Sequence, residues 1–294
     1  MNRKFQKLRH VLFLMPAAIF AIAFVLPVLV TMTNSFMSGF EIQSRYDINV
    51  LPTNVFHIQD VFPQIHFVRM TILPTRATLQ QYFLLLRDVG YMWGFWNSVL
   101  ITAPSVLGQI VVAVPAAFAF EMSTWRHKEK LFFVYVLIML MPLPVILVPQ
   151  FIMAGFMGIS DSVSAIVLPA VFNPFGVFLL RQFMKSMPRD VIEAATLDGA
   201  GQLRVIVHMV VPLMKPAVAA LALLIFIDFW NVVDQAIVFI PDPARLPLSV
   251  GLAEMITNVD MVFAASFFYM IPALLVFLYG QEYLVDGLRI STMK

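Results

Sequence analysis

Residues 188–212, PRDVIEAATLDGAGQLRVIVHMVVP, form a polar and glycine-broken interruption between two long apolar runs. Pro188 favours a helical start, and Glu193 stands early in that helix, where an acidic side chain interacts favourably with the helix dipole. Gly199 then permits a sharp change of direction. The following residues repeat apolar side chains at helical spacing as far as Pro212. The segment therefore predicts an amphipathic elbow, made of a helix, a break and a second helix.

The composition of the whole chain is that of a membrane protein. Of the 294 residues, 61% are hydrophobic and 12% are charged, and the mean hydropathy is +0.87, whereas an ordinary soluble domain has roughly 25% charged residues. A net charge of +2 is too small to indicate nucleic acid as a partner. The chain has no cysteine, and its five histidines lack metal-ligand spacing, so neither disulfides nor a metal site is expected.

Six segments are long and apolar enough to cross a hydrocarbon core, which takes about 20 residues. They are residues 11–33, 96–120, 131–155, 162–181, 213–239 and 262–285. We therefore expect an all-α, polytopic membrane protein with six transmembrane helices. Prolines inside several segments predict kinked or broken helices, above all around MPLPVILVP at 141–149.

Lysine and arginine residues are unevenly divided between the loops, which indicates the side of the membrane on which each loop lies. Fourteen of the 19 fall in the two termini and in residues 124–130 and 181–215. The remaining five are Arg45, Arg69, Arg76, Arg87 and Arg245. The positive-inside rule puts the larger group in the cytoplasm. Both termini are then cytoplasmic, as an even number of spans requires.

The first apolar run could belong to a cleaved signal peptide or to a retained helix. It is longer than the roughly 7–15 residues of a signal-peptide core, and no good small-residue cleavage site ends it, so we expect a retained helix. The expected organisation is a cytoplasmic N-terminus with the first span (1–35), an extracytoplasmic loop (36–92) with a short helix at 78–88, a core domain of five spans (93–285), and a cytoplasmic tail (286–294).

The residues alone leave two interpretations of the elbow open. It could be a connecting loop whose apolar face rests on the bilayer. It could instead be a docking element, in which Ala194 and Ala195 allow a partner to approach closely and Glu193 offers a charge to a basic residue on that partner. Composition does not separate the two.

The run EAATLDGA followed by VVPLMKP resembles the EAA loop of permease subunits from binding-protein-dependent ABC importers. Other stretches resemble the carbohydrate-uptake group, in particular the second permease of the maltose-transport type: WNSVLIT (96–102), AAFAFE (116–121), MPLPVILVPQF (141–151), FLLRQFMKSMPRDVIEAATLDGA (178–200) and FIDFWN (226–231). The resemblance covers roughly residues 75–289. It implies a type I ABC importer permease fold in a bacterial or archaeal cytoplasmic (inner) membrane.

The same resemblance assigns roles within an EAA coupling loop over 186–212. It implies that Glu193, Ala194 and Ala195 lie on a coupling helix that seats in a groove of a cytosolic ATPase subunit. Asp198 and Gly199 match the bend that follows this helix. The C-terminal tail lacks the second glycine that the family usually has before its final lysine, so a contact between tail and ATPase stays open.

The chain contains no GxxxxGK[ST] phosphate loop, so we expect it to bind no cofactor and to be no enzyme, with ATP bound and hydrolysed on a partner. The resemblance implies a heterodimer with a second permease subunit, two cytosolic ATPase subunits, an extracytoplasmic solute-binding protein, and contact with membrane lipid. The complex would translocate a sugar or oligosaccharide by alternating access.

Polar residues in the fifth span, LLIFIDFWNVVDQAIVFI (223–240), are candidates for a substrate pathway. At about 100° per residue, Asp228, Asn231 and Asp234 share one face of a continuous helix. A charged side chain facing lipid costs about 2.5–3.5 kcal/mol, which favours turning this face into the bundle. Helix packing or a hydrogen bond to the partner permease is the alternative, and Trp230 could stack on a sugar ring or simply pack.

Other functional classes are less favoured. An intramembrane enzyme would need nucleophile and base motifs, and both GxSxG and HExxH are absent. A self-sufficient secondary transporter would often have internal repeats and more spans, and would need no docking elbow. An importer permease for a non-sugar solute stays open, because the EAA loop recurs across import permeases.

Overall fold

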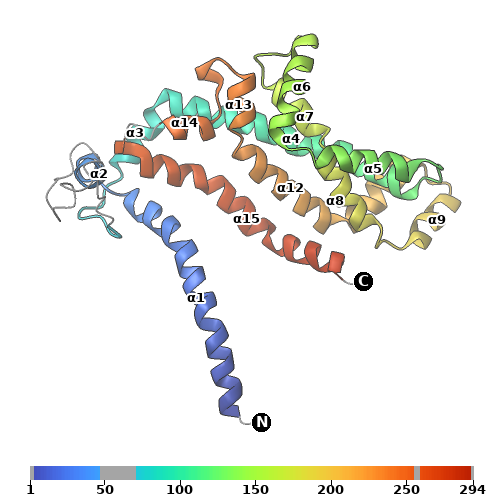
Figure 1. Ribbon diagram of the computed structural model, residues 1–294, viewed down its shortest axis with the longest axis horizontal. Helices are drawn as coiled ribbons and strands as arrows, with labels where there is room; N and C mark the ends of the chain where they lie inside the picture. Colours follow the sequence, from blue (N-terminus) through green and yellow to red (C-terminus); the bar gives the residue numbers. More distant parts are fainter. Residues whose placement is uncertain (1–2, 47–70, 255–258, 293–294) are drawn as a thin grey trace. The chain divides into compact units, whose positions relative to one another are not determined.

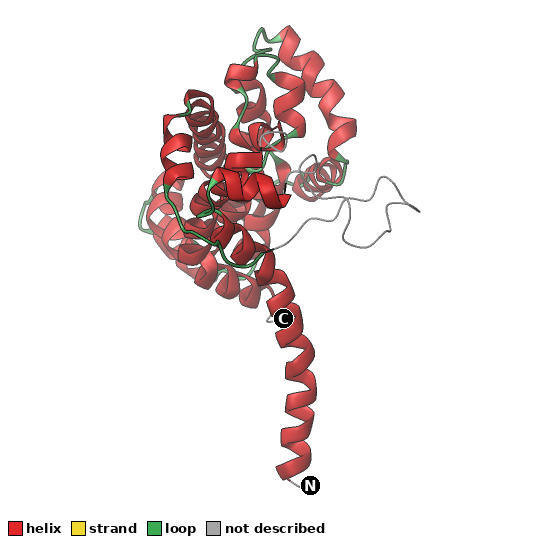
Figure 2. Ribbon diagram, turned by 90° about the vertical axis from the view of Figure 1, so that its left-hand side faces the viewer, coloured by secondary structure: helices red, strands yellow, loops and turns green. Residues whose placement is uncertain are grey.

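The computed structural model describes residues 3–46, 71–254 and 259–292, which form helices and connecting loops without a strand among them (Figure 1). Figure 2, coloured by secondary structure, shows the same all-helical composition from a second direction. The all-α prediction is confirmed over these residues. The chain divides into two compact units, Met1–Met92 with Leu252–Met270 and Trp93–Gly251 with Ile271–Lys294.

The first unit combines short helices with the ends of longer ones. Its elements are α1 (Arg3–Asn34), α2 (Gly39–Tyr46), α3 (Gln80–Arg87), the start of α4 (Val89–Met122), the 3-10 turn η5 (Val259–Met261) and the start of α15 (Val262–Thr292). Helix α3 confirms the short helix expected at 78–88, whereas the sequence did not predict α2. Residues 47–70 of the expected extracytoplasmic loop lie outside the described residues.

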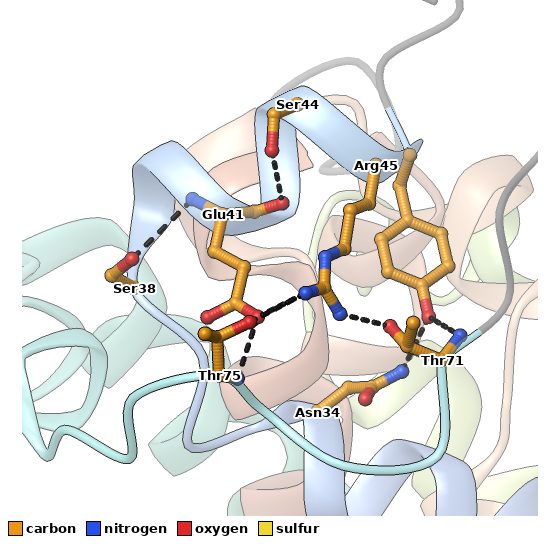
Figure 3. Close-up of polar contacts among 8 residues, drawn as sticks. Asn34, Ser38, Glu41, Ser44, Arg45, Thr71 and Thr75 are labelled. Atoms are coloured by element: carbon orange, nitrogen blue, oxygen red, sulfur yellow. Dashed lines mark hydrogen bonds and ion pairs between the residues drawn. The ribbon is translucent and has the colours of Figure 1, made fainter.

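A cluster of polar side chains fixes α2 to the segment that precedes α3 (Figure 3). The Glu41 carboxylate accepts the Thr75 backbone N–H at 2.7 Å and pairs with the Arg45 guanidinium at 2.9 Å. Arg45 also donates to the hydroxyls of Thr71 and Thr75, each at 2.6 Å. Burial raises the pKa of Glu41, but the hydrogen bonds from Thr75 and the charge of Arg45 outweigh burial and hold this pKa below its ordinary value of 4.5.

The second unit carries most of the helices. Besides the remainder of α4 and α15, it contains α5 (Lys128–Met139), α6 (Leu143–Phe156), α7 (Ser164–Val171), α8 (Pro174–Met184), α9 (Arg189–Leu197), α10 (Gln202–Val205), the π-helical turn η2 (Ile206–Val210), α11 (Val211–Leu213), α12 (Lys215–Trp230), α13 (Asp234–Phe239), η3 (Pro243–Arg245) and the start of α14 (Leu248–Glu254). Helix α4 begins at Val89, before the expected start of the core at 93, and α15 continues to Thr292, so most of the expected tail is helical.

Four helical stretches within the described residues are long and apolar enough to cross a membrane: Leu14–Asn34, Val89–Met122, Ser164–Met184 and Val262–Tyr283. Two further pairs pass the same test together but are bent: α5 with α6 at 102°, and the stretch from α10 through α11 with α12 at 82°. Over the described residues, the number of candidate spans is therefore four, or up to six if each bent pair counts as one. The break between α5 and α6 confirms the expectation around 141–149, because Pro142 has an extended backbone and begins a new helix.

The expected continuous fifth span at 213–239 is wrong. Helix α12 ends at Trp230, and α13 begins only at Asp234. Within this break, the Ser249 hydroxyl donates to the Val232 carbonyl. At the end of α12, Asn231 Nδ2 donates at 2.8 Å to the Ile227 carbonyl, which also accepts the Asn231 backbone N–H at 3.3 Å. Satisfied backbone groups make such a break tolerable at membrane depth.

A buried glutamine supports a second break, between α7 and α8. Gln109 of α4 is 1% exposed. With its side-chain amide oriented so that both the nitrogen and the oxygen have partners, Gln109 donates to the Ala170 carbonyl at 3.3 Å and accepts the Gly176 N–H at 3.2 Å. Asn173 caps α8 by accepting the Phe175 N–H at 2.9 Å. Gln109 thus hydrogen-bonds the backbone on both sides of the break between α7 and α8.

The lowered pKa of Glu41 predicts an acid-dependent loss of stability. Because the carboxyl is more acidic in the folded protein than in the unfolded chain, its stabilising contribution is complete well above pH 4.5 and is lost as the pH falls through the folded-state pKa. We expect the wild type to lose thermal stability in detergent more steeply than Glu41→Gln below about pH 4.5. Glu282→Gln, at an exposed carboxyl of α15, is the control, and parallel pH profiles of wild type and Glu41→Gln would contradict the assignment.

Candidate functional site

The first helix of the elbow is α9, and it forms as the sequence predicts. Pro188 has an extended backbone (φ −63°, ψ 120°) and stands immediately before the helix. The helix ends in a glycine turn, in which the Gly199 N–H donates to the Thr196 carbonyl at 3.1 Å and the Ala200 N–H donates to the Ala195 carbonyl at 3.0 Å. This pair of bonds is a Schellman motif, and it requires the left-handed backbone of Gly199, whose φ is +82°.

The second piece of the elbow contains a feature that the sequence did not predict. Helix α10 passes directly into the π-helical turn η2, in which the Val211 N–H donates to the Ile206 carbonyl five residues earlier. Pro212 follows at once, and because it has no N–H it removes one rung of the ordinary helical ladder. The chain then turns by 82° into α12.

The elbow is amphipathic, and its two faces have different surroundings. Ile192, Val205 and Val210 are buried in the core of the second unit. On the other face, Leu197 is 89% exposed and Leu203 is 74% exposed. The elbow is therefore anchored to its own chain on one side and presents apolar side chains on the other.

The five coupling candidates lie together on α9 and at its C-terminal turn. Glu193, Ala194, Asp198 and Gly199 are exposed, and Ala195 is half-buried against the core. Their exposure leaves small and charged groups accessible along one short helix, next to exposed Leu197.

A hollow of about 740 Å³ separates part of the elbow from the end of α4. Its walls include Met122 and Ser123 on the α4 side, and Glu193 and Thr196 on the α9 side. No pattern in the sequence indicates this hollow, because it is formed by segments about 70 residues apart in the chain.

The pathway candidates are divided by the end of α12. Asp228 is exposed on α12, close in the helical repeat to Leu224 and Ile227, which are 39% and 38% exposed. Asn231 is exposed at the helix end, and Asp234 is exposed at the first residue of α13. The expected single polar face is wrong, because the helical repeat does not continue from Asp228 to Asp234.

Trp230 lies in the core, where its ring is enclosed by other aromatic side chains. It is 2% exposed. Its ring stacks on Phe226 at a centroid distance of 5.5 Å and meets Phe95 edge-on at 5.8 Å. The structure favours the packing role of Trp230 over stacking on a sugar.

Among the residues that the structure describes, no three histidine or acidic side chains are grouped so that they could hold a metal ion. Arg181 of α8 is buried, although the sequence pattern indicated only that it is one of the cytoplasmic positive residues. Its guanidinium pairs with Glu121 and Glu129. The distribution of lysine and arginine residues along the sequence could not identify these ion pairs.

Proline-broken apolar helices joined by an exposed elbow define a polytopic membrane component. The chain belongs to the family of binding-protein-dependent transport system inner membrane components, whose family model matches residues 109–290. It is thus the permease component of a binding-protein-dependent ABC importer.

Curated relatives resemble the chain over most of its length. It is 26% identical over 226 residues to the arabinooligosaccharides transport system permease protein AraQ of Halalkalibacterium halodurans, covering 75% of this chain and 81% of the relative. It is 31% identical over 227 residues to the osmoprotective compounds uptake permease protein GgtD of Synechocystis sp., covering 75% and 76%.

The fold is shared with a chain in the crystal structure of a bacterial ABC transporter involved in the import of the acidic polysaccharide alginate. The TM-score is 0.76 at 22% sequence identity, and the match covers 96% of this chain and 98% of that chain. The similarity extends to nearly the whole length of both chains, including the helices outside the matched family segment.

The left-handed turn at Gly199 predicts a position-specific effect of an added methyl group. A Cβ atom would meet open space at both Gly199 and Gly201, but only Gly199 has a positive φ. We expect Gly199→Ala to destabilise the end of α9 by about 1 kcal/mol, with faster hydrogen exchange of the residue 200 amide. Gly201→Ala is the matched control, and equal exchange in the two variants would contradict the role of the turn.

Proposed function

We propose that this chain is one of two permease subunits that form the pathway of an ATP-driven importer with the type I fold. The exposed apolar face of the elbow is the observation that carries the proposal. Leu197 and Leu203 project from a helix pair whose opposite face is already packed in the core. Apolar side chains that remain exposed on an anchored elbow favour docking to a partner over a role as a simple connector.

The partner at this face is a cytosolic ATPase subunit. Ala194 permits close approach, Glu193 offers a charge to a basic residue, and Leu197 supplies apolar area. The permease sequence has no phosphate loop of its own, so ATP is bound on two such ATPase subunits, and this chain binds no cofactor and catalyses no reaction.

The remaining arrangement follows from the charge pattern and the family. Both termini and the elbow lie in the cytoplasm, as the excess of lysine and arginine in those segments favours. A solute-binding protein delivers cargo from outside, a dependence that the family description includes. Closure of the ATPase pair then moves the elbows and switches the permease heterodimer between inward-open and outward-open states.

A sugar or oligosaccharide is the proposed cargo. The relative AraQ is named for arabinooligosaccharides, and the transporter with the shared fold imports a polysaccharide. The name of GgtD, which refers to osmoprotective compounds, keeps a small non-sugar solute as the second candidate. Mass spectrometry of ligand retained by the purified complex distinguishes the two.

Asp228 is the strongest candidate in the pathway. It is exposed on α12 of the isolated chain, and a carboxylate turned to lipid at this depth would cost about 2.5–3.5 kcal/mol. Its face is therefore covered by the second permease or opens into a hydrated pathway between the two subunits. Asn231, exposed at the end of the same helix, lies where it could hydrogen-bond a passing hydroxyl.

Charge reversal at the elbow tests the docking surface. We expect Glu193→Lys and Leu197→Asp to leave the permease inserted but to weaken ATPase association by roughly 30-fold, the effect of losing an interface hot spot. Arg126→Glu, in the exposed 124–130 turn, is the charge-reversal control. Copurification and uptake are the measurements, and wild-type values for both elbow variants would refute the assignment.

Removal of the Asp228 carboxylate tests the pathway. We expect Asp228→Ala to raise the uptake KM by about tenfold if the carboxylate hydrogen-bonds cargo, the effect of losing a bond to a charged group, and Asp228→Asn to retain part of the affinity. Leu224→Ala, on the same exposed face, is the matched control. Unchanged kinetics and selectivity in Asp228→Ala, with the ligand identified by mass spectrometry, would exclude the pathway role.

A further inference from the structure

Arg181 is a buried cation that joins three helices near the elbow. It stands in the last turn of α8 and is 2% exposed. Its Nε lies 3.3 Å from Glu121 Oε2, and its second guanidinium branch bonds to Glu129 Oε1. The guanidinium carbon lies 4.0 Å from the centre of the Phe132 ring. One side chain thus contacts the end of α4 and the first turns of α5.

The turn between α4 and α5 is closed by a second cation of the same group. Lys128 Nζ donates to the backbone carbonyls of Glu121 at 3.0 Å and of Ser123 at 2.7 Å. The ring of Phe132 also stacks on Phe178 of α8, with centroids 6.3 Å apart. The end of α4, the turn and the start of α5 are therefore held as one body against α8.

A guanidinium suits this position better than an ammonium would. Its planar fork can bond two carboxylates in different directions while its face lies on an aromatic ring. Glu121 is nearly buried, with a side chain 9% exposed, whereas that of Glu129 is 66% exposed. Removal of Arg181 would leave the Glu121 carboxylate buried without this partner, which is strongly unfavourable.

Arg181 and its carboxylate partners connect the helix that precedes the elbow to the end of α4. Helix α8 ends at Met184, three residues after Arg181, and residues 185–188 connect it to α9. The end of α4, which Arg181 contacts through Glu121, forms the opposite wall of the 740 Å³ hollow. Because that hollow separates α9 from part of the α4 wall, a movement of α9 could be absorbed there by closing empty space. A rigid connection between α8 and the α4–α5 body prevents the hollow from absorbing this movement.

We propose that Arg181 is a positioning residue that transmits movements between the elbow and the α4–α5 body. It acts by holding Glu121 and Glu129 to the end of α8, so that α9, α4 and α5 respond together. The inference rests on the proposed function as an ATP-driven permease, since only then does the elbow receive movement from an ATPase.

Stimulation of ATP hydrolysis by the external binding protein tests this inference. The assembled complex is reconstituted in lipid nanodiscs, and hydrolysis per complex is measured with and without the binding protein as purified. We expect Arg181→Gln to keep basal hydrolysis but to lower the stimulation factor by about tenfold, within the range over which network mutations alter coupling. Arg181→Lys, which keeps the charge but not the fork, should lie between this variant and the wild type.

The control is Lys185→Gln, which removes one positive charge from an exposed position four residues further along the chain. It should keep the wild-type stimulation factor. A purely structural role for Arg181 would reduce the yield of assembled complex but leave stimulation per complex unchanged, and that result would overturn the inference.

A second variant decides the question if Arg181→Gln does not assemble. Glu129→Gln alters the exposed half of the group and should lower stimulation by about twofold. Wild-type stimulation in both Glu129→Gln and Arg181→Lys would then overturn the inference. Absence of stimulation in the wild-type complex would instead count against the proposed function itself, so the two failures are distinguishable.

Discussion

The constraint on which the structure depends is that backbone hydrogen bonds cannot be left unsatisfied inside a membrane. This chain breaks its helices repeatedly, and at two of the breaks polar side chains hydrogen-bond the backbone. Gln109 hydrogen-bonds the backbone on both sides of the break between α7 and α8, and the Asn231 side-chain amide donates to the Ile227 carbonyl at the end of α12. Broken helices therefore remain compatible with the bilayer.

Sequence reasoning succeeded where a break has a local cause. The prolines around Pro142 predicted the gap between α5 and α6, and Gly199 predicted the turn after α9. It failed at residues 231–233, which contain neither proline nor glycine. There the Val232 carbonyl is satisfied by the hydroxyl of Ser249, 17 residues away, and a helical-repeat analysis of one segment cannot include that partner.

The same distinction applies to the site. The elbow was predictable because its acidic first turn, small residues and glycines are contiguous, and the resemblance to a known loop added roles for Glu193 and its neighbours. The connection through Arg181 was not predictable, because its carboxylate partners are 60 and 52 residues away. The positive-inside rule uses such an arginine only to orient the chain across the membrane, whereas the burial of Arg181 shows that it joins helices.

The isolated chain also has side chains exposed to surroundings that are unfavourable for them. This mismatch argues for assembly with other subunits. In the proposed orientation, Leu197 projects into the cytosol while 89% exposed, and Asp228 is exposed on a membrane-spanning helix. Neither is stable alone, since apolar area favours burial from water and a carboxylate favours removal from lipid. Under the proposed function, an ATPase groove covers Leu197, and a second permease around a hydrated pathway covers the face of Asp228. The two proposed partners therefore answer two different physical penalties, at opposite ends of the bent stretch from α9 to α12.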